Sequence, residues 1–219
     1  MPSLTVENYL KTIFQLDDPG GESVATGRIA EAMGVSPGTV TSMLKTLAEA
    51  NLASYKPYEG VQLTSAGRTL ALRVIRRHRL IEHFLVHTLH LPWDEVHEEA
   101  EHMEHAVSDR LVDRIDQFLG FPRFDPHGDP IPTADGAIVE RGAIPLTECD
   151  PGLQFRVVRV LEQSPQFLRE LTESGIGIGV TGKVRQSHAD GSRTLDLGRV
   201  PLRLDPQALE SICVVPVGS

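Results

Sequence analysis

The segment from residue 26 to residue 53 constrains the fold most, because it contains two short helical patterns separated by Gly34. Ser36 followed by Pro37 is the pair expected at the N-cap and first position of a new helix. The residues that follow, LASYKPYEGVQLT, are typical of a strand, a turn and a second strand, with Lys56 and Tyr58 near the tip. A helical hairpin without DNA binding is the plain alternative, but a β-hairpin directly after it favours a winged helix.

The second helix of this module carries small polar side chains near its start, namely Thr39, Thr41 and Ser42, and Lys45 lies one turn later. Such groups can reach base edges and phosphates from the major groove. Few Lys and Arg residues are present here, so we expect weak, salt-sensitive nonspecific affinity and a need for two copies on one DNA site.

Residues 4–16 predict an amphipathic helix before this module, and residues 64–120 predict further helices with a break near Ser108. The later helices carry more apolar surface than they need for themselves, which predicts self-association through Leu70, Val74, Ile81, Leu85, Leu111, Val112 and Ile115. Residues 121–145, rich in Pro, Gly and Asp, are expected to form a linker.

Short strands are expected after the linker, in FRVVRVL, IGIGVTGKVRQS, RTLDLG and ICVVPV, with turns at Gly182 and near Asp190. One short helix, SPQFLRELTES, lies between them, which is typical of a small β-barrel of SH3-like size. The predicted fold is mainly α with α+β ends. It comprises a winged-helix domain (1–72), a helical dimerisation and metal-binding domain with its linker (73–142) and an SH3-like domain (143–219).

The stretch VHEEAEHMEH predicts a metal site. On a helix turning about 100° per residue, His97, Glu101, Glu104 and His105 share roughly one quadrant beside an apolar stripe. Imidazole and carboxylate groups together suit a divalent transition metal. His78 and Glu82 form a second pair one helical turn apart, for which a solvated polar face is the simpler interpretation when the pair is taken alone.

The net charge of −9 is confined to the middle of the chain, where residues 91–142 carry four Lys and Arg against thirteen Asp and Glu. A bound cation would relieve this field, and the N-terminal part stays free to approach phosphate. Cys149 and Cys213 are too few for a disulfide framework or a thiolate zinc site. Without an apolar run of membrane length or a leader, we expect a cytoplasmic protein with no membrane partner.

Six segments follow one another along the whole chain: ENYLKTIFQL, SPGTVTSMLKTLAEANL, LTSAGRTLA, RRHRLIEHFL, VHEEAEHMEHAVSD and PHGDPIP. Together they resemble the diphtheria toxin repressor family of metal-dependent regulators. The resemblance implies a homodimer in which metal binding enables operator binding. By position it implies a primary metal site at Asn8, Glu101, Glu104 and His105. It also implies an ancillary site at His78, Glu82 and His97, to which the SH3-like domain can add Gln163 and Gln166. The implied DNA-contacting positions are Thr26, Arg28, Ser36, Pro37, Thr39, Thr41, Ser42 and Lys45.

Position 101 is Glu, as in the manganese-responsive branch, where the iron-responsive branch has Cys. Position 8 is Asn, where the family more often has Met or Asp, and position 11 is Lys where one binuclear manganese site has Glu, so a binuclear site is not expected. Oxygen ligands with one imidazole suit Mn(II), with Fe(II) as the second choice. Zn, Co, Ni and Cd are expected to substitute in vitro.

The resemblance implies repression of manganese or iron homeostasis genes by a dimer on a palindromic operator, with reading heads ~34 Å apart. A winged-helix regulator with a different effector and a metal-dependent activator of efflux genes are the alternatives. An enzyme is not expected. A zincin helix needs two His residues at i and i+4, whereas His97 and His102 are five apart.

Overall fold

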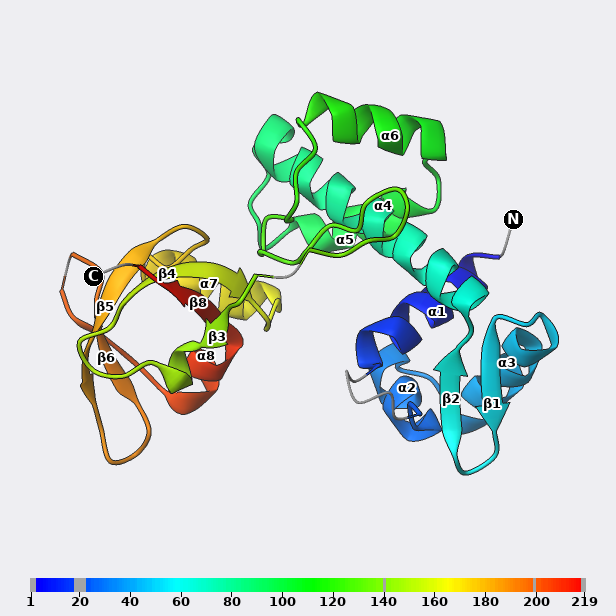
Figure 1. Ribbon diagram of the computed structural model, residues 1–219, viewed down its shortest axis with the longest axis horizontal. Helices are drawn as coiled ribbons and strands as arrows, with labels where there is room; N and C mark the ends of the chain where they lie inside the picture. The colour runs from blue at the N-terminus through cyan, green and yellow to red at the C-terminus, as the bar shows by residue number, and fades with distance from the viewer. Residues whose placement is uncertain (1–2, 18–22, 140, 199, 218–219) are drawn as a thin grey trace. The chain divides into compact units, whose positions relative to one another are not determined.

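The computed structural model describes residues 3–17, 23–139, 141–198 and 200–217 (Figure 1). The chain forms two compact units, which are described separately. The first comprises residues 1–78, 104–106 and 132–137, and the second comprises residues 79–103, 107–131 and 138–219. No helix in the described residues is long and apolar enough to cross a membrane.

The first unit contains the predicted winged helix. Its helices are α1 (Leu4–Leu16), α2 (Thr26–Met33), α3 (Pro37–Glu49) and the start of α4 (Ser65–Leu89), and its hairpin is β1 (Ala53–Lys56) with β2 (Gly60–Leu63). Gly34 takes a left-handed φ of 63° after α2, and the Ser36 hydroxyl accepts a hydrogen bond from the backbone N–H of Thr39 at 3.2 Å. The prediction of helix, glycine turn, capped helix and hairpin is therefore confirmed.

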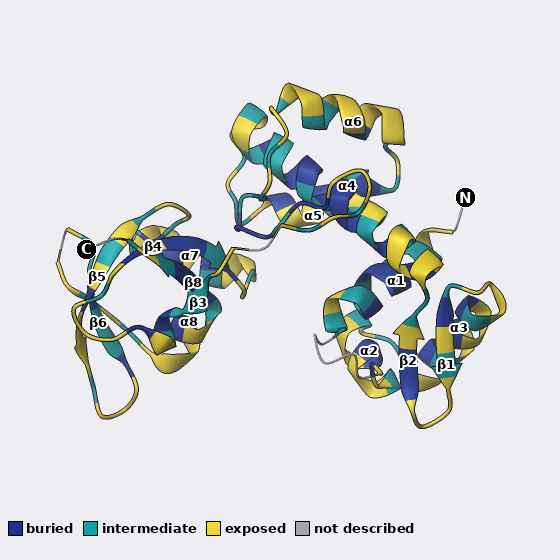
Figure 2. Ribbon diagram, in the orientation of Figure 1, coloured by how far each residue is buried: buried dark blue, intermediate teal, exposed yellow. Residues whose placement is uncertain are grey.

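The core of the first unit lies between the inner faces of its helices and the hairpin. Leu10, Ile29, Val40 and Val61 are completely buried there. Figure 2 shows buried positions concentrated on α1 and along the middle of α4. This packing leaves the opposite face of α3 exposed, so that face is available for another molecule.

The helical part of the second unit contains the rest of α4, α6 (Asp109–Phe118) and α5 (Val96–Glu104) except for its last residue, which belongs to the first unit. Ser108 caps α6 by accepting a hydrogen bond from the backbone N–H of Leu111, which confirms the predicted break. The predicted self-association surface is partly wrong. Most of its apolar side chains are buried within the chain, and Leu111 alone among them is largely exposed, as are Phe118 and Phe121, which the prediction did not include.

The C-terminal part of the second unit is a six-stranded antiparallel sheet in the order β3-β8-β4-β5-β6-β7. The strands are β3 (Ile144–Pro145), β4 (Gln154–Val160), β5 (Thr181–Ser187), β6 (Arg193–Asp196), β7 (Leu202–Leu204) and β8 (Ile212–Pro216). The helices α7 (Pro165–Glu173) and α8 (Pro206–Ser211) and a 3₁₀ turn (Leu146–Glu148) complete it. Phe155, Leu168 and Val214 belong to its core, as expected for an SH3-like domain.

Two details of this sheet differ from the prediction. The residues of IGIGV come before β5 rather than within it. Gly182 is not in a turn but inside β5, opposite Phe155, where a Cβ atom would lie 2.8 Å from the Phe155 ring. Glycine fits there because the Leu197 side chain, 2.6 Å from the same Cβ position, and the Phe155 ring fill the space of a side chain.

The predicted linker is packed in its middle rather than loose. Residues Asp125, His127, Gly128 and Asp129 are buried, and the backbone N–H of Val160 in β4 donates to the His127 carbonyl at 2.8 Å. Gly128 has a φ of 89°, and a Cβ atom there would lie 2.0 Å from the Val158 carbonyl oxygen. The linker and β4 therefore touch through their backbones, which only glycine permits.

Candidate metal centre and DNA-reading face

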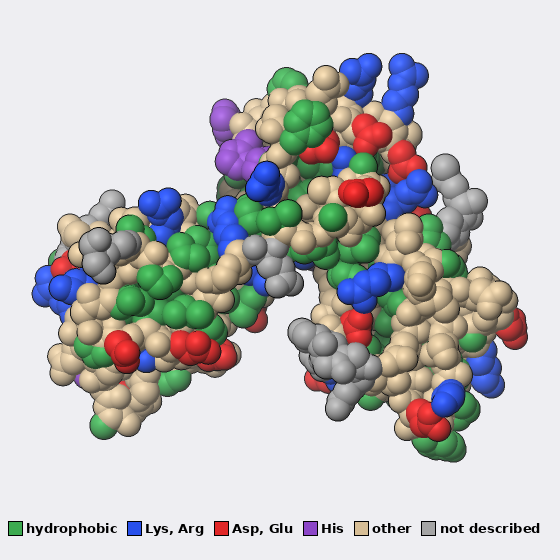
Figure 3. Space-filling view, in the orientation of Figure 1, with side chains coloured by type: hydrophobic (Ala, Val, Ile, Leu, Met, Phe, Trp, Pro, Cys, Tyr) green, Lys and Arg blue, Asp and Glu red, His purple; other side chains and the backbone are tan. Residues whose placement is uncertain are grey.

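The exposed face of α3 carries most of the predicted DNA-contacting residues. Arg28, Ser36, Pro37, Thr39, Ser42 and Lys45 are exposed, and Thr26 and Thr41 are half-buried. On the face drawn in Figure 3, Lys and Arg side chains of the N-terminal region are scattered and do not form a cluster. This agrees with the expectation of modest nonspecific attraction to phosphate.

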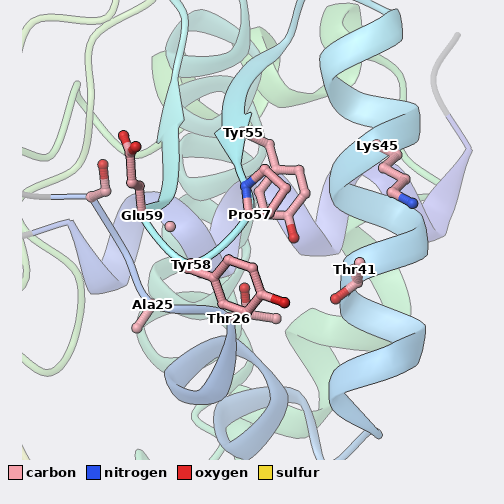
Figure 4. A pocket seen from close by; sticks show the side chains of 10 residues that line it. Ala25, Thr26, Thr41, Lys45, Tyr55, Pro57, Tyr58 and Glu59 are labelled. Atoms are coloured by element: carbon pink, nitrogen blue, oxygen red, sulfur yellow. The ribbon is translucent and has the colours of Figure 1, made fainter.

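A cavity of about 500 Å³ separates α3 from the wing (Figure 4). Thr26, Thr41 and Lys45 line it together with the wing residues Tyr55 and Tyr58. Tyr58 is fully exposed at the hairpin tip, with a left-handed φ of 68°. In Figure 4 its hydroxyl points toward Thr41 across the cavity, so the structure brings wing and helix residues onto one surface.

A buried cluster of charged groups lies in the first unit. The Lys11 ammonium donates to both carboxylate oxygens of Glu104, at 3.0 and 3.2 Å, and lies 3.2 Å from Nδ1 of His78. Glu104 is completely buried, and its Oε2 lies 2.7 Å from the same imidazole nitrogen. Lys11 thus supplies a positive charge beside a carboxylate that has no access to water.

His105 lies in the same cluster with its two ring nitrogens in different roles. Nδ1 lies 2.8 Å from a carboxylate oxygen of Glu7, which can only accept, so Nδ1 carries the proton. Nε2 is buried without a hydrogen-bond partner and lies 3.1 Å from Oε1 of Glu104. The Oδ1 atom of Asn8, from α1, is also buried without a partner. Imidazole nitrogen and amide oxygen atoms that are buried in this way are of the kind that coordinate a cation.

A second buried cluster lies in the second unit and joins α4 to the linker. Glu82, Asp125 and His127 each offer a ligand atom, and these atoms lie within 4.8 Å of one another. Nε2 of His127 donates to the Trp93 carbonyl at 2.8 Å, so Nδ1 is the ring nitrogen left for another ligand. Nδ1 is buried without a hydrogen-bond partner and lies 4.0 Å from both Glu82 and Asp125. Three potential metal-ligand atoms therefore lie close together in one small volume.

The protonation of Asp125 reflects this crowding. Burial raises its pKa well above the usual range, and the neighbouring carboxylates Asp129 and Glu82 raise it further. Arg79 opposes the shift from 3.7 Å. Without a cation, then, the fold resists placing full negative charge here.

The other predicted ligands fall around these clusters. Nδ1 of His97 lies 3.3 Å from Glu82, and Nε2 of His97 lies 3.8 Å from Glu101. Gln163 donates to Asp129 and shares a cavity with His97, whereas Gln166 is exposed and donates to Glu170. His78, which the resemblance groups with Glu82, hydrogen-bonds to Glu104.

The helical quadrant predicted from spacing is not fully formed. α5 ends at Glu104, so His105 lies just beyond it, and Glu101 belongs to the second unit while Glu104 and His105 belong to the first. Asp125 and His127 were missed as candidate ligands. The motif PHGDPIP held the signal, but its Pro and Gly content indicated a linker and drew attention away from its acid and imidazole groups.

Sequence models of known families match nearly the whole chain. Residues 1–61 match the N-terminal DNA-binding domain of iron-dependent repressors, and residues 64–133 match their metal-binding and dimerisation domain. Residues 144–216 match the FeoA domain.

Individual proteins are similar to this chain over most of its length. The iron-dependent repressor IdeR of Mycobacterium tuberculosis is 36% identical over 171 residues, covering 77% of this chain and 72% of that protein. The diphtheria toxin repressor of Corynebacterium diphtheriae is 36% identical over 202 residues, covering 87% and 88%. A manganese-dependent transcriptional repressor solved with manganese is 40% identical, with a TM-score of 0.88 over 97% of this chain and 100% of that one. The manganese regulator SloR gives a TM-score of 0.77 at 32% identity, over 97% and 98%.

Proposed function

The chain belongs to the diphtheria toxin repressor family of iron- and manganese-dependent transcriptional repressors, and from that premise we propose that it is a manganese-responsive repressor. Its effector is Mn(II), with Fe(II) as a weaker one, and its target is a palindromic operator bound by a homodimer in the cytoplasm. The regulated genes are those of manganese or iron uptake. Repressors of this family bind DNA and metal and are not enzymes.

One observation carries the proposal of metal control. In each buried cluster, one imidazole nitrogen donates to an oxygen and the other has no hydrogen-bond partner beside buried carboxylates, at His105 and at His127. That arrangement orients a histidine for metal coordination. Asn8, Glu104 and His105 would hold a cation in the first unit, and Glu82, Asp125 and His127 would hold one in the second, with His97 beside it. The assignments of Glu101, His78, Gln163 and Gln166 stay predictions.

Both donor sets fit Mn(II) by their chemistry. They offer carboxylate or amide oxygens with imidazole and no sulfur, which suits a hard divalent ion. When bound, the ion supplies positive charge that neutralises the crowded carboxylates. The segment carrying Glu104 and His105 is then fixed to α1, which packs directly against the reading module. Metal and operator must each strengthen binding of the other, because the coupling is reciprocal.

The test is operator binding by fluorescence anisotropy with chelator-treated protein, titrated with Mn(II) and with anaerobic Fe(II) at fixed salt. The duplex is one selected from a random pool by Mn-loaded protein. We expect DNA affinity to rise steeply with Mn(II) and at higher concentration with Fe(II). Equal affinity with and without metal would contradict metal control, and a selected site without two-fold symmetry would contradict the palindromic operator.

Replacing Lys45 with Ala is expected to weaken operator binding and to reduce the slope of log K against log salt by about 1, because one phosphate contact is lost. Lys183→Ala, an exposed lysine on β5, is the matched control and should leave the slope unchanged. Anisotropy titrations at several salt concentrations measure both. An unchanged slope for Lys45→Ala would remove Lys45 from the DNA-contacting surface.

A further inference from the structure

A cavity of about 720 Å³ opens in the second unit beside the second cluster. Its walls come from His83 and His87 of α4, from Trp93, from the start of the linker and from the end of α7 and the loop after it, within residues 172–180. This volume falls within the ~300–1,000 Å³ range of small-molecule sites. Apart from Asp125, the lining residues have no part in the proposed metal or DNA binding.

Two guanidinium groups line the cavity, those of Arg123 and Arg141. Neither forms an ion pair with any residue in the described ranges. The Arg141 guanidinium stacks over the Phe124 ring, 3.5 Å from its centroid. Asp125 is the one acidic residue among the described lining residues, and its Oδ1 is held by the backbone N–H groups of His127 and Asp129. Among the described lining residues, positive charge therefore exceeds negative charge.

The remaining wall is apolar and flat. Trp93 stacks on His127 with ring centroids 5.8 Å apart and 17° between the planes, and Phe124, Ile176 and Ile178 face the same space. Next to them, the backbone N–H groups of Gly177 and Ile178 donate to no described residue. Free consecutive N–H groups in a glycine-rich loop favour an anion.

We propose that this cavity binds a small aromatic carboxylate. The ring packs against Trp93 and Phe124, and the carboxylate pairs with Arg141, with Arg123 and the 177–178 backbone nearby. Guanidinium groups recognise carboxylates through paired N–H donors, and they also stack on aromatic faces. The apolar walls disfavour a bare inorganic anion, which would lose hydration without an apolar body to bury.

Trp93 is the single tryptophan of the chain, so its fluorescence reports on this cavity directly. Benzoate is the probe, added to full-length, metal-free protein and followed by Trp fluorescence and by calorimetry. We expect saturable one-site binding, and binding of benzyl alcohol at least about tenfold weaker, because it lacks the charge. No saturation below about 10 mM benzoate, or equal binding of the alcohol, overturns the proposal.

Two variants locate the site. Arg141→Ala should weaken benzoate binding by about tenfold or more, whereas Arg114→Ala, an exposed arginine of α6, should not. Gly177→Leu should block the cavity without removing a charge, since a Cβ atom there meets nothing within 4 Å and the backbone is not left-handed. Thermal unfolding confirms that each variant is folded. If benzoate still binds to both Arg141→Ala and Gly177→Leu, its site lies elsewhere and the proposal is overturned.

Discussion

Replacing Lys11 with Ala in chelator-treated protein is expected to lower the free energy of unfolding by about 3 to 5 kcal/mol. Glu104 is completely buried, and both of its carboxylate oxygens accept hydrogen bonds from the Lys11 ammonium. Without Lys11 a charged group stays in the interior with its cationic partner removed. Urea unfolding followed by circular dichroism measures the loss.

The control for this prediction is Lys56→Ala. Lys56 also pairs with a glutamate at 3.0 Å, but both side chains of that pair are about two-thirds exposed. Exposed pairs contribute ~0–1 kcal/mol, so this variant should unfold almost like the parent. A double variant, Lys11→Met with Glu104→Gln, should recover much of the loss because no charge is left unpaired.

Metal should act differently on these proteins. In Lys11→Ala, a divalent cation can provide the positive charge that Glu104 has lost, so Mn(II) should raise its unfolding midpoint more than that of the parent. A loss below about 1 kcal/mol for Lys11→Ala would show that Glu104 is compensated by other groups. If Mn(II) raised the unfolding midpoint of both proteins equally, Lys11 would not influence metal binding at this centre.

Asp125→Asn is expected to change stability and metal binding in opposite directions. The pKa of Asp125 is raised, first by burial and then by Asp129 and Glu82, so its charged form is disfavoured in the folded protein. The carbonyl oxygen of Asn can still accept from the backbone N–H groups of His127 and Asp129, which now bond to Oδ1. The metal-free variant should therefore unfold at higher urea near neutral pH.

The same substitution should also reduce Mn(II) affinity. Loss of a residue that only hydrogen-bonds to a metal ligand typically costs ~10–100-fold, and loss of the ligand Asp125 itself should cost more. Calorimetry with Mn(II) measures this, with Asp113→Asn on the exposed face of α6 as the control. Gains in stability and losses in affinity together are the signature of a binding site. Unchanged Mn(II) affinity would exclude Asp125 as a ligand.

The sign of the pH dependence follows from the raised pKa. Folded protein holds the Asp125 proton to higher pH than unfolded protein, so this group favours folding at low pH. Its contribution is lost as pH rises from the ordinary value of 3.8 through the raised folded pKa. The difference in unfolding free energy between Asp125→Asn and the parent should thus grow with pH over that window. A constant difference would contradict the raised pKa.

Local patterns in the sequence predicted the reading module well. The turn at Gly34, the cap at Ser36 and the hairpin each depend on residues close in the chain. The metal residues depend on distant partners. Lys11 stood out as a charge where a ligand was expected, but only the fold shows Glu104 and His78 as its partners.

The second cluster was not predicted from the sequence, for a related reason. Composition identified residues 121–145 as a linker, and loops normally lie on the surface, so their polar groups are solvated. Here the turn at residues 125–129 is pressed against β4, which buries Asp125 and His127 and changes their chemistry. Gly182 shows the same effect, because its role depends on Phe155 in the neighbouring strand.

The backbone contact between linker and sheet has one more consequence. β4 pairs with β5 from Gln154 to Arg156, and Val157 exchanges backbone hydrogen bonds with Gly179 and Val180, so the residues after Val157 would present an open strand edge on that side. The His127 carbonyl takes the N–H of Val160 and closes part of that edge. Pulling the linker away would uncover a template for pairing with a second chain. The linker therefore protects the C-terminal sheet against domain exchange and aggregation as well as connecting it.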